Sequence, residues 1–290
     1  MTRIMAGGTE IEYDTFGDPQ DPPLVLVMGL GTQMTAWEPG FCEMLAGRGL
    51  HVVRFDNRDV GLSARFDAPP VPDLPALLGG DPSSAPYTLA DMAGDTLGLF
   101  DALDIPRAHL VGASMGAMIA QEFAIRHPGR LLSLCSIMSS TGDRSVGRPT
   151  PAALGALLAP AGADRDEAVQ RGVEISRAIG SPAYPAPDAV VRARVEAAYD
   201  RAFNPAGVLR QFAAVVTAED RTEALRGVTV PTLVIHGQDD PLIDADGGKA
   251  TAAAIPGALL ELIPGMGHDL PPQLWPRLVA AIAANAARAA

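Results

Sequence analysis

The chain has 290 residues, 48% of them hydrophobic, and 34 acidic against 22 basic residues give it a formal net charge of −12. This length and composition predict a folded globular protein with a sizeable core, and the negative charge argues against a nucleic-acid partner because phosphate backbones would be repelled. The chain begins without the apolar stretch of a secretion signal and holds no run near the roughly 18 apolar residues of a membrane span, so we expect a soluble, cytoplasmic protein with no membrane partner.

The first predicted element is a strand. The residues TEIEYDTFG at 9–17 alternate in polarity as an exposed strand does, and the glycine and prolines that follow close it with turns. We expect an antiparallel strand at the edge of a sheet.

Six short apolar runs follow. They are LVLVM at 24–28, HVVRF at 51–55, HLVGA at 109–113, LLSLCSIM at 131–138, TLVIH at 232–236 and ALLELI at 258–263. Continuous apolarity over a few residues is typical of strands buried on both faces, as in a parallel sheet covered by helices.

Helical patterns separate these runs. In the segment 88–105, Thr88 and Asp91 have the spacing of a capping box, and apolar residues recur at helical spacing. A second helix is predicted from Met115 to His127, because Pro128 cannot easily continue it. The alternation of strands and helices predicts the α/β class.

The alternation stops between residues 142 and 222. This stretch is rich in Ala and Pro, offers no convincing strand, and contains helix-like patterns at 164–180 and 188–203. We interpret it as an insertion, which divides the chain into a first core part (1–141), a helical segment (142–222) and a second core part (223–290).

The two cysteines, Cys42 and Cys135, fall in a predicted helix and a predicted buried strand. Two cysteines provide no disulfide framework and no metal-ligand spacing, so we interpret both as core residues. The chain also lacks a dinucleotide-binding fingerprint, and we expect no metal and no cofactor.

The motif VGASMG at 111–116 sets Ser114 directly after a predicted strand and directly before a predicted helix. A sharp strand-turn-helix corner lifts a serine hydroxyl clear of a sheet, and glycines at 112 and 116 avoid collisions there. The helix N-terminus would lie beneath a developing oxyanion. Ser114 is therefore a candidate nucleophile, although a small residue filling a tight corner would give the same pattern.

A serine nucleophile needs a histidine base. His51 and His109 begin predicted strands and His127 ends a predicted helix, so we interpret these three as structural. His268 lies in the glycine-rich loop IPGMGHDLPP and is our candidate base, with His236 kept as the alternative.

The base in turn needs an acid, which in the chain order serine, acid, histidine should follow an earlier strand. The segment TLVIHGQDDPLI offers Asp239 and Asp240 just past a predicted strand. One of these two would be the acid, and the other could cap the turn.

The motifs VGASMG, VIHGQDDP and PGMGHDLP, in this order, resemble those of the α/β-hydrolase fold family over nearly the whole chain. The resemblance places the acid three residues after Gly237, which selects Asp240, and implies a triad of Ser114, Asp240 and His268. It also implies an oxyanion hole made by the backbone N–H groups of Leu30 and Met115, of which the elbow motif predicts the second independently.

Two departures from the family pattern stand out. The family usually follows its first parallel strand with a His-Gly pair, and this chain has Met28 and Gly29 instead. The segment RFDNRDVGLS resembles the family's turn D-x-R-G-x-G-x-S, with Asp59 in the place of a glycine. Within that turn we interpret four residues as structural, namely Asp56, Arg58, Gly61 and Ser63.

For the substrate pocket we predict Gly29, Met138 and Met266. The two methionines would give the pocket a flexible apolar lining, and the alternative is that they are ordinary core residues. The segments FGDPQDPPLVLVMG, LHVVRFDNRDVGLS and IPGMGH resemble a bacterial subgroup of serine carboxylesterases that includes aclacinomycin methylesterase. The subgroup implies a helical cap, here residues 142–222, over the serine.

The resulting hypothesis is hydrolysis of a carboxylic ester of a small hydrophobic molecule, through a Ser-His-Asp triad and an acyl-enzyme intermediate, by a cofactor-independent enzyme acting as a monomer or homodimer. Three alternatives remain open: a carbon–carbon bond hydrolase or lactonase, a cofactor-free perhydrolase with haloperoxidase activity, and a non-catalytic ligand-binding protein on the same fold.

Overall fold

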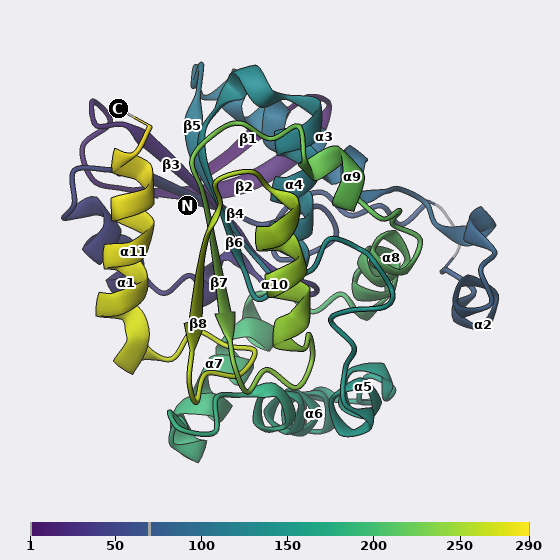
Figure 1. Cartoon of the computed structure of the whole chain (residues 1–290). Coiled ribbons are helices and arrows are strands. Elements are labelled where there is room, and N and C mark those ends of the chain that lie inside the picture. Colours follow the sequence, from purple (N-terminus) through teal and green to yellow (C-terminus); the bar gives the residue numbers. More distant parts are fainter. Residues whose placement is uncertain (1, 69–70, 290) are drawn as a thin grey trace.

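The computed structural model describes residues 2–68 and 71–289 (Figure 1). Within these residues, eight strands form one sheet in the order β1-β2-β4-β3-β5-β6-β7-β8. Their bounds are Thr2–Ala6 (β1), Thr9–Phe16 (β2), Pro23–Val27 (β3), His51–Phe55 (β4), Ala108–Ala113 (β5), Leu131–Ile137 (β6), Thr232–Gly237 (β7) and Leu259–Ile263 (β8). All pairs from β4 through β8 in this order are parallel. The predicted α/β class with a mostly parallel sheet is confirmed.

The prediction that the strand at residues 9–17 lies at the edge of the sheet is wrong. Strand β2 does run antiparallel, to β4, but β1 pairs with its other side, so β1 is the edge. The polar alternation of β2 was misleading because its Glu12 is buried and lies 3.3 Å from Arg3 of β1. An ion pair across two strands thus covers a position that the sequence presents as solvent-facing.

Helices cover both faces of the sheet (Figure 1). One face carries α1 and α11, and the other carries α3, α4 and α10, each over its own cluster of buried apolar side chains. Their bounds, with those of two shorter helices, are Pro39–Ala46 (α1), Leu74–Leu78 (α2), Leu89–Ala102 (α3), Met115–Arg126 (α4), Thr222–Leu225 (α9), Ala245–Ala254 (α10) and Trp275–Ala287 (α11). Both hydrogen bonds of the predicted capping box between Thr88 and Asp91 are present at the start of α3.

The helical segment, residues 142–222, is described throughout and contains no strand. Its main helices are Pro151–Leu158 (α5), Arg165–Ile179 (α6), Asp188–Arg201 (α7) and Pro205–Val216 (α8). Figure 1 shows α5 to α7 beyond the ends of β7 and β8. The division of the chain into two core parts and a separate cap stays a prediction.

Both cysteines are buried and free, as expected of core residues. Burial raises the pKa of the Cys42 thiol to about 12, and it also raises the pKa of Cys135. No helix among the described residues has the length and apolar character needed to cross a membrane.

Candidate active site

Ser114 occupies a strained corner between β5 and α4. Its backbone has φ 56° and ψ −122°, outside the regions that residues with a side chain prefer, and its amide donates to the carbonyl of Ile137 at 2.9 Å. A Cβ atom at Gly112 would lie 2.2 Å from the Gly116 oxygen, and one at Gly116 would lie 2.2 Å from the Val27 oxygen. The glycines of the motif are therefore required by the close approach of β3, β5 and α4.

The structure brings Ser114, His268 and Asp240 together. His268 Nε2 lies 2.9 Å from Ser114 Oγ, and His268 Nδ1 lies 2.7 Å from Asp240 Oδ2. An ionised carboxylate only accepts hydrogen bonds, so Nδ1 carries the proton and Nε2 is free to accept from the serine hydroxyl. This is the tautomer in which a histidine can remove a proton from Ser114.

Asp240 is held as a buried anion. Its Oδ1 accepts from the backbone amides of Leu242 and Ile243, each at 2.9 Å. Burial opposes its ionisation, but hydrogen bonds from His236, His268 and the Ile243 amide together hold the pKa of Asp240 well below its usual range. The carboxylate therefore stays charged beside His268.

Asp239 and His236, the alternative acid and the alternative base from the sequence, have other partners than Asp240 and His268. Asp239 is exposed, and its Oδ2 accepts from the Gly265 amide at 2.7 Å. His236 Nε2 donates to the carbonyl of Ile243 at 2.8 Å and lies 3.4 Å from Asp240 Oδ2, whereas the ring nitrogen that faces Ser114 Oγ is that of His268. The remaining histidines lie at β4, at β5 and after α4, as expected of structural residues.

The loop after β3, residues 28–32 (the β3 loop), lies against the serine. A Cβ atom at Gly29 would lie 3.1 Å from Ser114 Cβ, so a larger residue here would push against the serine. The Gly31 and Thr32 amides are hydrogen-bonded within the protein. Among the described residues, the amides of Leu30 and Met115 donate to no partner, as an oxyanion hole requires.

The predicted pocket methionines are buried. Met138 follows β6 with a positive φ of 45°, and Met266 follows β8; both belong to the apolar cluster on the α1 and α11 side of the sheet, together with Met28. Met266 is fully buried. Their contact with a substrate, like that of Gly29, stays a prediction.

The loop after β4, residues 56–66 (the β4 loop), contacts the helical segment. Asp56 accepts from the Met34 amide at 2.7 Å and pairs with Arg201 of α7 at 2.7 Å. A Cβ atom at Gly61 would lie 2.0 Å from Asp56 Oδ2, and Ser63 Oγ donates to the Asp56 carbonyl at 2.6 Å. These contacts agree with the structural role expected for this loop.

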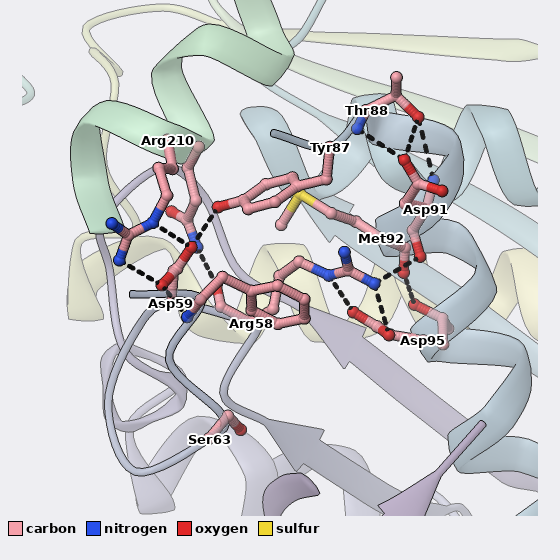
Figure 2. Close-up of polar contacts among 12 residues, drawn as sticks. Arg58, Asp59, Ser63, Tyr87, Thr88, Asp91, Met92, Asp95 and Arg210 are labelled. Atoms are coloured by element: carbon pink, nitrogen blue, oxygen red, sulfur yellow. Dashed lines mark hydrogen bonds and ion pairs between the residues drawn. The ribbon is translucent and has the colours of Figure 1, made fainter. Parts of the chain in front are cut away.

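Asp59 makes the contact that the sequence did not reveal. Figure 2 shows Arg210 of α8 and Tyr87 converging on its carboxylate, while Arg58 turns the other way toward Asp95. Both hydrogen bonds from Arg210 to Asp59 are 2.8 Å long, and Tyr87 Oη donates at 2.8 Å. The only sequence signal was the aspartate in a glycine place.

The helical segment also holds the loop after β8, residues 264–271 (the β8 loop). The His268 amide donates to the Ile179 carbonyl at 2.7 Å, and the Gly267 amide donates to Ser181 Oγ at 2.9 Å. Ser181 in turn donates to Asp269, whose pKa is raised by burial despite these hydrogen bonds. The candidate base is thus fixed partly by residues outside the sheet.

The fold is shared with known proteins. The family model described as "alpha/beta hydrolase fold" matches residues 22–272. Rhodomycin D methylesterase DauP of Streptomyces sp. (strain C5) is 31% identical, over 93% of this chain and 92% of its own. The putative carbamate hydrolase RutD of Variovorax paradoxus is 26% identical, over 89% of each chain.

Among solved structures, the enol-lactonase from Burkholderia xenovorans LB400 superimposes with a TM-score of 0.73. The match covers 98% of this chain and 99% of the other, at 24% identity. At that identity the likeness shows a shared fold and no more.

Proposed function

Because the chain belongs to the α/β hydrolase fold family, we propose that it is a serine esterase that cleaves a carboxylic ester of a small hydrophobic molecule. Family membership and the methylesterase relative support a hydrolase activity. The observation that carries the finer proposal is the hydrogen-bonded series of Ser114, His268 and Asp240, with distances of 2.9 and 2.7 Å.

In the first half of the reaction, His268 Nε2 takes the proton of Ser114 Oγ as that oxygen attacks the ester carbonyl carbon. The amides of Leu30 and Met115 donate to the oxyanion of the tetrahedral intermediate. The intermediate collapses, the bond to the alcohol oxygen breaks, and His268 returns its proton to the leaving alcohol. The acyl group remains on Ser114.

In the second half, water replaces the alcohol. His268 removes a proton from water, whose oxygen adds to the acyl carbon, and a second oxyanion forms in the same place. Its collapse breaks the bond to Ser114 Oγ, which takes the proton back from His268 and releases the carboxylic acid. Throughout, Asp240 keeps His268 in its tautomer and stabilises the imidazolium.

The substrate proposal draws on the relative. The protein with 31% identity over nearly the whole chain is a methylesterase of rhodomycin D. We therefore take the methyl ester of a small hydrophobic molecule as the first substrate class to test. Met138 and Met266, which we predict to line the pocket, are buried in the apolar cluster on the α1 and α11 side of the sheet.

The test compares the wild-type protein with Ser114→Ala on p-nitrophenyl acetate, butyrate and octanoate, and measures methanol release from rhodomycin D. We expect turnover to fall by about 10⁴-fold or more in the variant, because it lacks the nucleophile. Ser133→Ala, which removes a buried hydroxyl bonded to His109, is the matched control and should retain activity. Equal rates for wild type and Ser114→Ala, or folded protein that cleaves none of these esters, would overturn the proposal.

A further inference from the structure

Helix α8 lies directly on the β3 loop through one buried side chain. Gln211 is fully buried, its Oε1 accepts from the Gly31 amide at 2.8 Å, and its Nε2 donates to the Arg58 carbonyl at 2.7 Å. Val208, three residues earlier on the same helix face, lies so close that a Cβ atom at Gly31 would be 3.0 Å from its Cγ2. One amide side chain therefore bridges the β3 loop and the β4 loop.

This contact completes a set that fixes two successive peptide units. The Leu30 carbonyl accepts from Thr32 Oγ1 at 3.0 Å, while the Gly31 amide of the same unit donates to Gln211. The Gly29 carbonyl accepts from the Thr32 amide at 3.2 Å. In a trans peptide the C=O and N–H groups point in opposite directions, so holding the Gly29 oxygen aims the Leu30 N–H away from Thr32.

Gln211 is the member of this set that comes from outside the loop. Gly31 has a positive φ of 63°, a conformation that glycine reaches at little cost but also leaves easily. The hydrogen bond to a buried, doubly bonded side chain restricts that freedom. Without it, the Leu30 to Gly31 peptide unit could rotate and carry Thr32 with it, which would break the hydrogen bond from the Thr32 amide to the Gly29 carbonyl. The Gly29 to Leu30 peptide unit, and with it the direction of the Leu30 N–H, would then no longer be fixed.

The position of Gln211 is in turn set by its neighbour Arg210, whose hydrogen bonds to Asp59 are drawn in Figure 2. The doubly hydrogen-bonded pair of Arg210 and Asp59 is buried, with side chains 2% and 0% exposed. At the start of α8, a Cβ atom at Gly207 would lie 2.3 Å from the Asp59 carbonyl oxygen, which itself accepts from Asn204 Nδ2 at 3.0 Å. Helix α8 is thus tied to the β4 loop along its first two turns.

We propose that Gln211 is a positioning residue for the oxyanion hole, acting through Gly31 on the direction of the Leu30 N–H, with the Asp59 and Arg210 pair holding α8 in place for it. This inference rests on the proposed esterase function. It assigns to the helical segment a part in transition-state stabilisation in addition to covering the serine.

The test is Gln211→Met, which keeps the length and volume of the side chain and removes both hydrogen bonds. We expect kcat to fall by about tenfold, less than the roughly 10²-fold or more for loss of an oxyanion donor itself, with KM changed by less than about twofold. A trifluoromethyl ketone inhibitor, whose hemiketal oxygen would occupy the oxyanion hole, should bind more weakly by the same factor as kcat.

Asn285→Leu is the matched control, because Asn285 is also a buried amide that donates to a backbone carbonyl, that of Leu134 at 2.9 Å, but in the middle of β6. It should keep the wild-type kcat and inhibitor affinity. If Gln211→Met does not fold, Gln211→Asn, whose shorter side chain cannot make both contacts, should show the same separation of kcat from KM.

An unchanged kcat in both Gln211 variants would overturn the inference, and so would an equal loss in Asn285→Leu. Ser114→Ala separates this failure from failure of the proposed function: if Ser114→Ala is inactive and the Gln211 variants are fully active, only the positioning role is wrong. If Ser114→Ala hydrolyses esters as the wild type does, both the esterase proposal and the positioning role of Gln211 are wrong.

Discussion

Asp239 and Asp240 are neighbours in the chain, yet the fold gives them different partners. Asp240 is buried and accepts hydrogen bonds from His268 and two backbone amides, whereas Asp239 is exposed and accepts from the Gly265 amide. The residues alone left both open as the acid, and the family resemblance selected Asp240. Which of two adjacent side chains turns inward depends on the backbone conformation of the chain after β7. Two identical neighbouring residues do not reveal that conformation.

Asp240→Asn is expected to lower kcat by about 10⁴-fold with little loss of folded protein. An asparagine keeps the size of the side chain but removes the anion that fixes the tautomer of His268 and stabilises its charged form. Steady-state hydrolysis of p-nitrophenyl butyrate measures the effect. Asp239→Asn is the control and should stay within about twofold of wild type; the reverse order of effects would mean that Asp239 is the acid.

At the scale of elements, the buried parallel strands and the elbow helix could be predicted because their signals are local. Continuous apolar runs marked β3 to β8, and Pro128 marked the end of α4. Strand β1 was missed because the pairing of Arg3 with Glu12 depends on register and leaves no periodic pattern. Helix α8 and Gln211 were missed because their partners in the β3 and β4 loops lie about 150 to 180 residues away in the chain.

The attachment of α8 can be measured by a double-mutant cycle on Asp59 and Arg210. Arg210→Met should lower the free energy of unfolding by about 3 to 5 kcal/mol, because it leaves the Asp59 carboxylate buried without its cation. Asp59→Gly should cost less, because the exposed Asp67 still pairs with Arg210 and because glycine tolerates the φ of 67° at this position. Urea unfolding measures all three variants.

The double variant should be less destabilised than the sum of the two single variants, because each partner then no longer leaves the other unpaired. Additive costs would show that the ion pair contributes no interaction energy.

For the whole molecule, the same buried carboxylate predicts how stability depends on pH. Burial opposes the charge on Asp59, but hydrogen bonds from Arg210, the Phe66 amide and Tyr87 hold its pKa below the usual value. A carboxylate with a lowered folded-state pKa stabilises the protein above the unfolded-state pKa of roughly 4, and this contribution is lost as the pH falls through the folded-state pKa.

The stability difference between wild type and Asp59→Asn should therefore be constant from pH 7 to about pH 5 and should shrink below about pH 4. Urea midpoints at pH 7, 5, 4 and 3 measure it. A difference that grows toward low pH would contradict the direction of the pKa shift.

The helical segment is attached to the β3, β4 and β8 loops of the core. Gln211 and Arg210 hold the β3 and β4 loops, and Ser181 with Ile179 holds the β8 loop that carries His268. Exchanging residues 142–222 for those of a relative, as one would to change substrate preference, would therefore also remove supports of the nucleophile's surroundings. A functional chimera needs the partners on the core, Asp56 and Asp59 above all, to be transplanted with the segment, so substrate range and catalytic power in this protein should evolve together.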